Sequence, residues 1–137
     1  MALDKKLIAI RVDIIERNLN EIRNIAKEGL KNYRNELAAK HALLESIEAC
    51  IDISNHIISA KGFRRPVDYK DVFEVLKEEK IISEKLAEKL KEMAKFRNVL
   101  VHKYAIVDKK RLLRIMKEDV RDIEQFIKEI MKKLKSS

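Results

Sequence analysis

Apolar residues recur at alternating steps of three and four along most of the chain, which is the spacing of an amphipathic α-helix. The first run predicts one long helix that ends near Gly29. Its stripe consists of Ile8, Val12, Ile15, Leu19, Ile22 and Ala26. Residues that repeat in this way lie on one face, so this helix packs one side against a core and exposes the other.

The second predicted helix covers residues 35–60 and stops at Lys61 and Gly62, because glycine is favoured just after the end of a helix. Its inward-facing residues are Leu37, Leu44, Ile47, Ile51 and Ile58. Apolar side chains occur on more than one of its sides. Such a helix is either central to a bundle, or it faces a second subunit as well as its own core.

Three further helices complete the prediction. Pro66 disfavours helix at the residue before it, so 62–68 is a loop, and a short helix follows over 69–79. Ser83 and Asp108 are favourable caps for the last two long helices. Their stripes are predicted to be Leu86, Leu90, Met93, Phe96 or Arg97, and Leu100 in the first, and Met116, Val120, Ile123, Ile127, Ile130 and Leu134 in the second. Together these elements predict an all-α, up-and-down bundle of four long helices and one short helix, in a single domain over 1–137.

The composition agrees with an all-α fold. Hydrophobic side chains make up 46% of the 137 residues, but only 2 Gly and 1 Pro occur, too few turn residues for a β-sandwich or barrel. The 31 basic and 23 acidic side chains give a net charge of +8, which attracts polyanions such as RNA. A composition rich in Lys and Glu is also typical of hyperthermophile proteins, so charge alone leaves nucleic-acid binding open.

The sequence also bears on the compartment of the protein. Cys50 is the only cysteine, so no internal disulfide and no cysteine-based zinc site can form, as is usual in a reducing cytosol. The first residues lack the apolar core of a signal peptide, and no uncharged run approaches the roughly 20 residues of a membrane span. We therefore expect a soluble, cytoplasmic protein that does not insert into a membrane.

Candidate chemistry is concentrated in residues 96–104, which we call the motif. Arg97 suits a phosphate, because its planar fork donates to two oxygens, and His102 exchanges a proton near neutral pH. Arg97 and Tyr104 are seven apart and share a helical face. Arg97 and His102 lie about 140° apart around a helix, so they converge only if the arginine reaches across or the helix ends near His102. The structural alternative is a salt-bridged Arg97, a His102 that caps the helix C-terminus and a Tyr104 packed on the core.

The motif resembles the Arg-x4-His-x-Tyr signature of the HEPN superfamily, and more specifically that of the HepT toxins, also grouped as the DUF86 family. The segment 47–56 resembles the Ile-Asp-x-x-x-His stretch of that family, with Asp52 and His56 at its polar positions. Residues 65–73, Leu76 and the pair Ile81-Ile82 resemble its middle section. Five separated blocks agree in order, so the resemblance spans nearly the whole chain.

The resemblance implies a toxin that cleaves RNA as a metal-independent endoribonuclease and is paired with a small nucleotidyltransferase (MNT-domain) antitoxin. Arg97 and His102 correspond to the catalytic pair of the family, and Asn98 to the polar residue that follows the motif arginine. Tyr104 corresponds to the tyrosine that the partner modifies with AMP, which silences the toxin. Family members dimerise so that two motifs line one cleft, so a homodimer is expected here as well.

Three polar residues of the second predicted helix are candidates to support the motif. Asp52, Asn55 and His56 share one helical face, from which we expect them to hold the motif arginine or histidine in place. Glu48, Asp52 and His56, at steps of four, resemble a metal site. Di-iron bundles need paired Glu-x-x-His motifs on two helices, however, and the sequence has none, so we expect neither a metal nor another cofactor.

Basic residues that follow the motif are candidates for a phosphate track. They are Lys103, Lys109, Lys110 and Arg111. A solvated helix face is the more common explanation of such a run. A second hypothesis for the whole protein keeps the fold but makes it a non-catalytic interaction module, which binds the nucleotidyltransferase and is modified by it. The intact Arg97 and His102 favour the nuclease.

Overall fold

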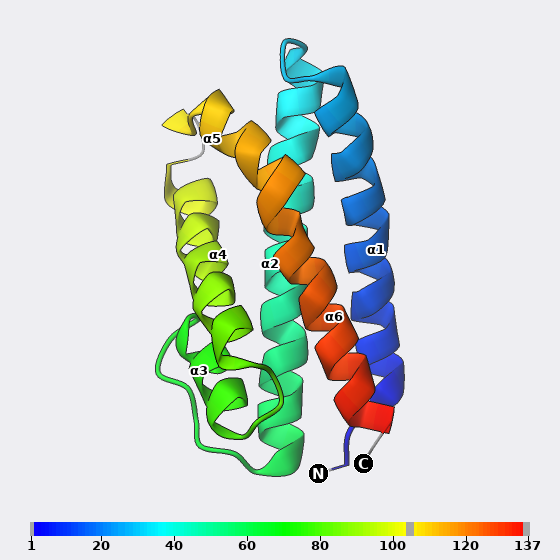
Figure 1. The fold of residues 1–137 in the computed structure, drawn as a ribbon, viewed down its shortest axis with the longest axis vertical. Helices are drawn as coiled ribbons and strands as arrows, with labels where there is room; N and C mark the ends of the chain where they lie inside the picture. Colours follow the sequence, from blue (N-terminus) through cyan, green and yellow to red (C-terminus); the bar gives the residue numbers. More distant parts are fainter. Residues whose placement is uncertain (1, 104–105, 136–137) are drawn as a thin grey trace.

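The computed structural model describes residues 2–103 and 106–135, and its regular elements in that part of the chain are all helical. They are α1 (Lys5–Glu28), α2 (Tyr33–Lys61), α3 (Asp71–Glu78), α4 (Glu84–His102), α5 (Lys109–Arg114), the π-helical segment η2 (Ile115–Asp119) and α6 (Val120–Lys135). Because α5, η2 and α6 follow one another without interruption, they form one long helix. The prediction of four long helices and one short helix, α3, is confirmed (Figure 1).

Helix α2 occupies the centre of the bundle. It packs against α1 and also contacts α3, α4 and α6. Figure 1 shows α1 on one side of it and α4 on the other. Fully buried side chains therefore occur around its circumference, among them Leu43, Ile47, Ile53 and Ile57. The chain itself covers the apolar sides of this helix, so its two-sided pattern gives no evidence of a second subunit.

The predicted helix ends are confirmed at three positions by the atoms that cap them. Gly62 follows α2 in a left-handed conformation with a φ of 70°, which glycine adopts without strain. At the start of α4, Ser83 Oγ accepts the Leu86 N–H at 3.2 Å. At the start of α5, Asp108 Oδ1 accepts the Lys110 N–H at 3.1 Å. Each side chain replaces a hydrogen bond that the first turn of a helix lacks.

Two helix starts differ from the prediction, and in both cases a polar side chain explains the difference. Helix α2 begins earlier, at Tyr33, because Asn32 Oδ1 accepts the Arg34 N–H at 2.8 Å and caps it there. Helix α3 begins later, at Asp71, because Asp68 Oδ1 accepts the Asp71 N–H at 2.8 Å and holds the residues between them in a turn.

The predicted stripes form one core, and none of the helices in the described residues is long and apolar enough to span a membrane. An edge-to-face contact between Phe73 of α3 and Phe126 of α6, with ring centroids 6.1 Å apart, joins the short helix to the last one.

Cys50 is a free, buried thiol whose pKa is raised by burial. Some residues of the predicted apolar stripes are only partly buried, namely Val12, Ala26, Leu37, Leu44, Ile127 and Leu134.

The last long helix contains one irregular turn that the apolar stripe did not predict. Residues 115–119 of η2 are π-helical. A π turn holds more residues than an α turn and so rotates the helix that follows it. Leu112 before this turn and Ile123 after it are both fully buried. The irregular turn therefore keeps α5 and α6 packed on the same core.

A charged cluster fixes the loop of residues 62–70 against α3. Arg64 donates from its two Nη atoms to the Asp71 carboxylate at 2.8 and 2.9 Å, and from Nε and Nη2 to Glu78 at 2.9 and 2.8 Å. Asp71 also accepts the Val67 N–H at 2.9 Å. Its hydrogen bonds with Arg64 lower the pKa of Asp71 to about 2. The loop that carries Tyr69 is thereby tied to a helix of the core.

Replacing Arg64 by alanine is expected to lower the unfolding temperature at pH 7, by an amount that depends on pH. The pKa of Asp71 is lower in the folded chain than its ordinary value of 3.8, and that of Glu78 is lower than its ordinary value of 4.5, so the pairing with Arg64 stabilises the fold fully above pH 4.5. This stabilisation is lost as the pH falls through about 2. Thermal unfolding followed by circular dichroism should show the difference between the two proteins narrowing over that interval. Arg65→Ala is the control, and a difference that stays constant down to pH 2 would contradict the assignment.

Candidate active site

Three neighbours hold the motif arginine in place. Arg97 lies in the second half of α4, and only 15% of its side chain is exposed. Its Nη2 donates to Glu48 Oε1 of α2 at 3.1 Å, and its Nη1 donates to Asn98 Oδ1 at 3.2 Å. The ring of Tyr69, in the 62–70 loop, has its centroid 4.4 Å from Arg97 Cζ. A carboxylate, an amide and an aromatic face together restrict the orientation of the guanidinium.

This arrangement leaves donors for a further ligand. Glu48 and Asn98 take up one N–H on each terminal nitrogen of Arg97, so the second N–H of each stays available. Two such N–H groups suit two oxygens of one phosphate or carboxylate. Nε is buried and has no hydrogen-bond partner among the described residues. Glu48 also offsets part of the positive charge of Arg97. It therefore orients the guanidinium and weakens its attraction for an anion.

His102 is exposed and is the last residue of α4. The Lys103 N–H still donates to Val99 O at 2.8 Å, and the helix ends there. His102 therefore keeps its helical position, about 140° around α4 from Arg97. The contacts of Arg97 in the described residues do not include His102, because Arg97 turns inward to α2. Tyr104 lies outside the described residues.

The expected contact of Asp52, Asn55 and His56 with the motif is corrected by the structure. Asp52 Oδ2 lies 3.4 Å from Arg11 Nε of α1, and His56 Nε2 accepts the Asp4 N–H at 2.7 Å. Asn55 is exposed, beside the end of α2 and the loop after it. Each step of four residues turns about 40° around a helix, so a row that starts toward α4 has rotated toward α1 two steps later. Asp52 and His56 therefore connect α2 with Arg11 of α1 and with Asp4 just before it.

Glu48 is the residue of this row that reaches the motif. It is half-buried on α2, one four-residue step before Asp52. The sequence pattern places Glu48 only in a possible metal site, but Glu48, Asp52 and His56 have three different partners. These are Arg97 of α4, Arg11 of α1 and the Asp4 N–H. In the described part of the chain, no group of three His, Cys, Asp or Glu side chains is arranged to hold a metal ion.

The basic residues after the motif fall into two kinds. Lys103, Lys109 and Lys110 are exposed near the junction of α4 and α5. Arg111 instead places its Cζ 5.0 Å from the centroid of the Phe96 ring, immediately before Arg97 in sequence. It therefore ties α5 to the motif helix by a cation–π contact. Among the described residues, the three lysines make no such contact with an aromatic ring.

The comparisons with known proteins agree on one family. Residues 13–130 match the family model described as ribonuclease HepT-like. The chain is 27% identical over 125 residues to a Shewanella oneidensis protein named mRNA nuclease HepT, which covers 88% of this chain and 93% of that protein. It is 43% identical over 88 residues to an Archaeoglobus fulgidus protein, covering 64% of this chain and 66% of that one.

Solved structures share the fold. The tri-AMPylated HEPN toxin of Shewanella oneidensis, in complex with an MNT antitoxin, has a TM-score of 0.85 at 27% identity, over 91% of this chain and 96% of that chain. The cytosolic protein YutE of Bacillus subtilis has a TM-score of 0.85 at 26% identity, over 99% of this chain and 94% of that chain. The matched residues 13–130 include all of α2, α3 and α4, which carry the site. The chain belongs to the ribonuclease HepT-like family.

Proposed function

We propose that this protein is the toxin of a HEPN/MNT toxin–antitoxin pair and cleaves RNA as a metal-independent endoribonuclease. The observation that carries the proposal is the Arg97 guanidinium, fixed between Glu48 and Tyr69, on the same helix that ends with an exposed His102. The relative named mRNA nuclease HepT and the HEPN toxin with its MNT antitoxin support the same activity and the same kind of partner. The direct test is cleavage of RNA by the purified protein in EDTA.

The proposed reaction uses the ribose of the RNA as nucleophile. Neutral His102 takes the proton of a 2′-hydroxyl, and that oxygen attacks the adjacent phosphorus. The bond from phosphorus to the 5′-oxygen breaks, and that oxygen takes a proton from an imidazolium. The products are a 2′,3′-cyclic phosphate and a 5′-hydroxyl. Arg97 stabilises the charge that develops on the phosphorane, while Asn98 holds the guanidinium from its other side.

We propose that two copies of the chain form a homodimer across the motif. Large apolar side chains are exposed in and after the motif, at Val101 and Ile106, and in the loop that carries Tyr69, at Val67 and Tyr69, with exposures between 42% and 85%. Exposed apolar side chains are frequent at protein interfaces, and a second copy would bring a second His102 to the motif. Light scattering should give twice the 16.1 kDa chain mass for the wild type and a single chain mass for Val101→Lys. Ile10→Lys, at an exposed isoleucine of α1, is the control, and a wild-type monomer at micromolar concentration would contradict the homodimer.

The RNA strand is proposed to continue from the motif onto the junction of α4 and α5. Lys103, Lys109 and Lys110 are exposed there, and Arg111 lies beside them. Lysine ammonium groups attract phosphates without reading the bases, so this segment would hold the strand without selecting its sequence.

Replacing Glu48 by alanine is expected to lower kcat for RNA cleavage about tenfold with a smaller change in KM, because Arg97 loses the carboxylate that orients it. Glu48→Gln keeps an oxygen that accepts the Nη2 N–H and should retain most of the activity. Glu92→Ala removes a carboxylate of α4 that pairs with Lys95 at 3.0 Å, and should leave both constants unchanged. Initial rates at several RNA concentrations give these values. Full activity of Glu48→Ala would mean that Glu48 does not position Arg97.

The antitoxin is proposed to silence the protein by transferring AMP to Tyr104. The phenol oxygen attacks the α-phosphate of ATP and pyrophosphate leaves, with the metal ion supplied by the nucleotidyltransferase. The added phosphate places negative charge two residues after His102, where the RNA phosphate must lie. Repulsion and steric blockage then both exclude the substrate.

A further inference from the structure

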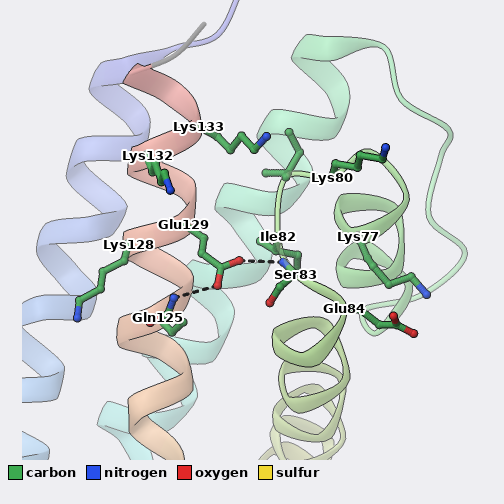
Figure 2. A pocket seen from close by; sticks show the side chains of 11 residues that line it. Lys77, Lys80, Ile82, Ser83, Glu84, Gln125, Lys128, Glu129, Lys132 and Lys133 are labelled. Atoms are coloured by element: carbon green, nitrogen blue, oxygen red, sulfur yellow. Dashed lines mark hydrogen bonds between the residues drawn. The ribbon is translucent and has the colours of Figure 1, made fainter.

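A pocket of 840 Å³ opens at the end of the bundle opposite the motif. Its walls are the turn between α3 and α4, the first residues of α4 and the last turns of α6. Figure 2 shows Lys133 reaching from α6 toward this turn, which carries Lys80 and Ser83. The charged residues of its lining are Lys77, Lys80, Lys128, Lys132 and Lys133, opposed by Glu84 and Glu129. We call it the lysine pocket.

The positive excess of the lysine pocket is not a general result of a lysine-rich sequence. The pocket between α4 and the helix that begins with α5 has three basic and three acidic residues in its lining. The pocket between α1 and the end of α6 has two of each. Beside α3 and α4, three lysines face five carboxylates. In these places acidic side chains balance the basic ones, whereas five lysines face two glutamates in the lysine pocket.

Part of the charge of the lysine pocket is compensated, since Lys77 pairs with Glu74 of α3 at 2.8 Å. Glu129 accepts the Ser83 N–H at 2.8 Å through Oε1 and the Gln125 amide at 3.0 Å through Oε2, which ties α6 to the start of α4 (Figure 2). Among the described residues, Lys80, Lys128 and Lys133 form no ion pair. All three are exposed, and Figure 2 shows Lys133 directed toward the turn between α3 and α4 and Lys128 directed away from it, so a polyanion bound here would attract solvated ammonium groups from both sides of α6.

The kinds of residue in the lining favour a phosphate chain as the ligand. No arginine lines the pocket, so the bidentate pairing by which arginine binds a carboxylate or a phosphate is absent, and lysine attracts phosphate as a point charge. No aromatic side chain lines it either, so a nucleobase has no ring on which to stack. The lining therefore suits the backbone of a nucleic acid better than a free nucleotide or an acidic protein.

We propose that the lysine pocket binds the phosphate backbone of single-stranded RNA at a place separate from the motif. Helix α4 joins the two, since Glu84 lines the pocket and Arg97 lies 13 residues further along, about 20 Å at the rise of an α-helix. RNA held in the pocket is thereby kept close to the motif. This last step, from binding to delivery of a substrate, rests on the proposed ribonuclease function, whereas the binding itself does not.

The test compares two triple variants that lose the same charge. The first is Lys80→Gln, Lys128→Gln, Lys133→Gln in the lysine pocket. The matched control is Lys27→Gln, Lys31→Gln, Arg34→Gln, at exposed positions around the turn between α1 and α2. The probe is a single-stranded RNA of about 20 nucleotides with 2′-O-methyl riboses, which lacks the nucleophile of the proposed reaction. Its Kd is measured by fluorescence anisotropy at several salt concentrations, for chains whose helicity and Tm match the wild type.

The pocket variant is expected to bind this RNA about tenfold more weakly at 0.1 M salt, and the slope of log K against log salt should become shallower by about 2. The control should keep both values near those of the wild type. Equal losses in the two variants would overturn the proposal, because net charge alone would then explain binding. Unchanged binding by the pocket variant would overturn it too, as would a pocket that binds poly-glutamate or ATP more tightly than the RNA. If the triple variant loses its fold, Lys133→Gln against Lys31→Gln gives the same comparison.

Discussion

Replacing His102 by alanine is expected to abolish RNA cleavage and to leave the bundle folded. General acid–base catalysis by a positioned histidine contributes about 10²- to 10⁴-fold to a rate. His102 is exposed and ends α4, so its removal takes no side chain out of the core. Cleavage of end-labelled RNA in EDTA measures the effect, and the wild-type product should carry a 2′,3′-cyclic phosphate. The free energy of unfolding of the variant should equal that of the wild type.

His41→Ala is the matched control for this experiment. His41 is also exposed, on α2, where its Nε2 lies 3.8 Å from Glu45 Oε2, and it has no place in the proposed reaction. Its loss should leave the cleavage rate unchanged. The proposed role of His102 would be refuted by a His102→Ala variant that cuts as fast as the wild type. A requirement for Mg²⁺ in the wild-type reaction would equally refute the metal-independent mechanism.

Local sequence signals predict most of the helices because they act over one or two turns. Ser83 and Asp108 mark the starts of α4 and α5 through hydrogen bonds to residues two or three positions away. Gly62 ends α2 because its own φ of 70° strains other residues. The start of α3 was missed for a related reason, since the Asp68 carboxylate competes with the helix for the Asp71 N–H. The π-helical turn depends instead on how the whole last helix packs, so a short stretch of sequence does not predict it.

The environment of Arg97 was harder to predict because it depends on contacts between distant parts of the chain. Glu48 lies 49 positions from Arg97, and Tyr69 belongs to a loop whose course is set by Arg64. The sequence shows that Glu48, Asp52 and His56 form a row, but not which neighbouring helix each of them meets. That depends on how the row rotates along α2 as it passes from α4 to α1. The residue types were therefore recognisable, while their partners required the fold.

The structural alternative for Arg97 and the catalytic one turn out to be compatible. Arg97 does form a salt bridge, with Glu48, as the structural alternative requires. That salt bridge uses one of its N–H groups and leaves others for a phosphate, as the catalytic hypothesis requires. A preorganised guanidinium costs no reorganisation when charge develops on the substrate, so the two roles reinforce each other. The contact between Arg97 and Glu48 therefore does not decide between a nuclease and a non-catalytic interaction module. A measurement of RNA cleavage does.

Tyr104→Phe is expected to block both modification by the nucleotidyltransferase and the silencing that follows. With ATP, Mg²⁺ and the partner, the wild-type chain should gain about 329 Da for each AMP that is added, because the phenol oxygen is the nucleophile. Phenylalanine keeps the aromatic body but has no such oxygen, so the variant should gain no mass and should go on cutting RNA in the presence of partner and ATP. Intact-mass spectrometry and the cleavage assay, run on the same samples, measure both effects.

Tyr33→Phe is the control for this last experiment, since Tyr33 is 68% exposed at the start of α2 and remote from the motif in sequence. That variant should be modified and silenced like the wild type, and Tyr104→Phe, which keeps the exposed phenol of Tyr33, should gain no mass, so exposure of a phenol is not sufficient. Modification of Tyr104→Phe at the wild-type rate would mean that Tyr104 is a packing residue and that the AMP is carried elsewhere. If the wild type were modified but its unmodified form never cut RNA, the interaction module would replace the nuclease as the function of this fold. If the AMP were added but RNA cleavage stayed unchanged, modification of Tyr104 would not be what silences the protein. Repulsion at the motif predicts instead that cleavage is lost when AMP is added.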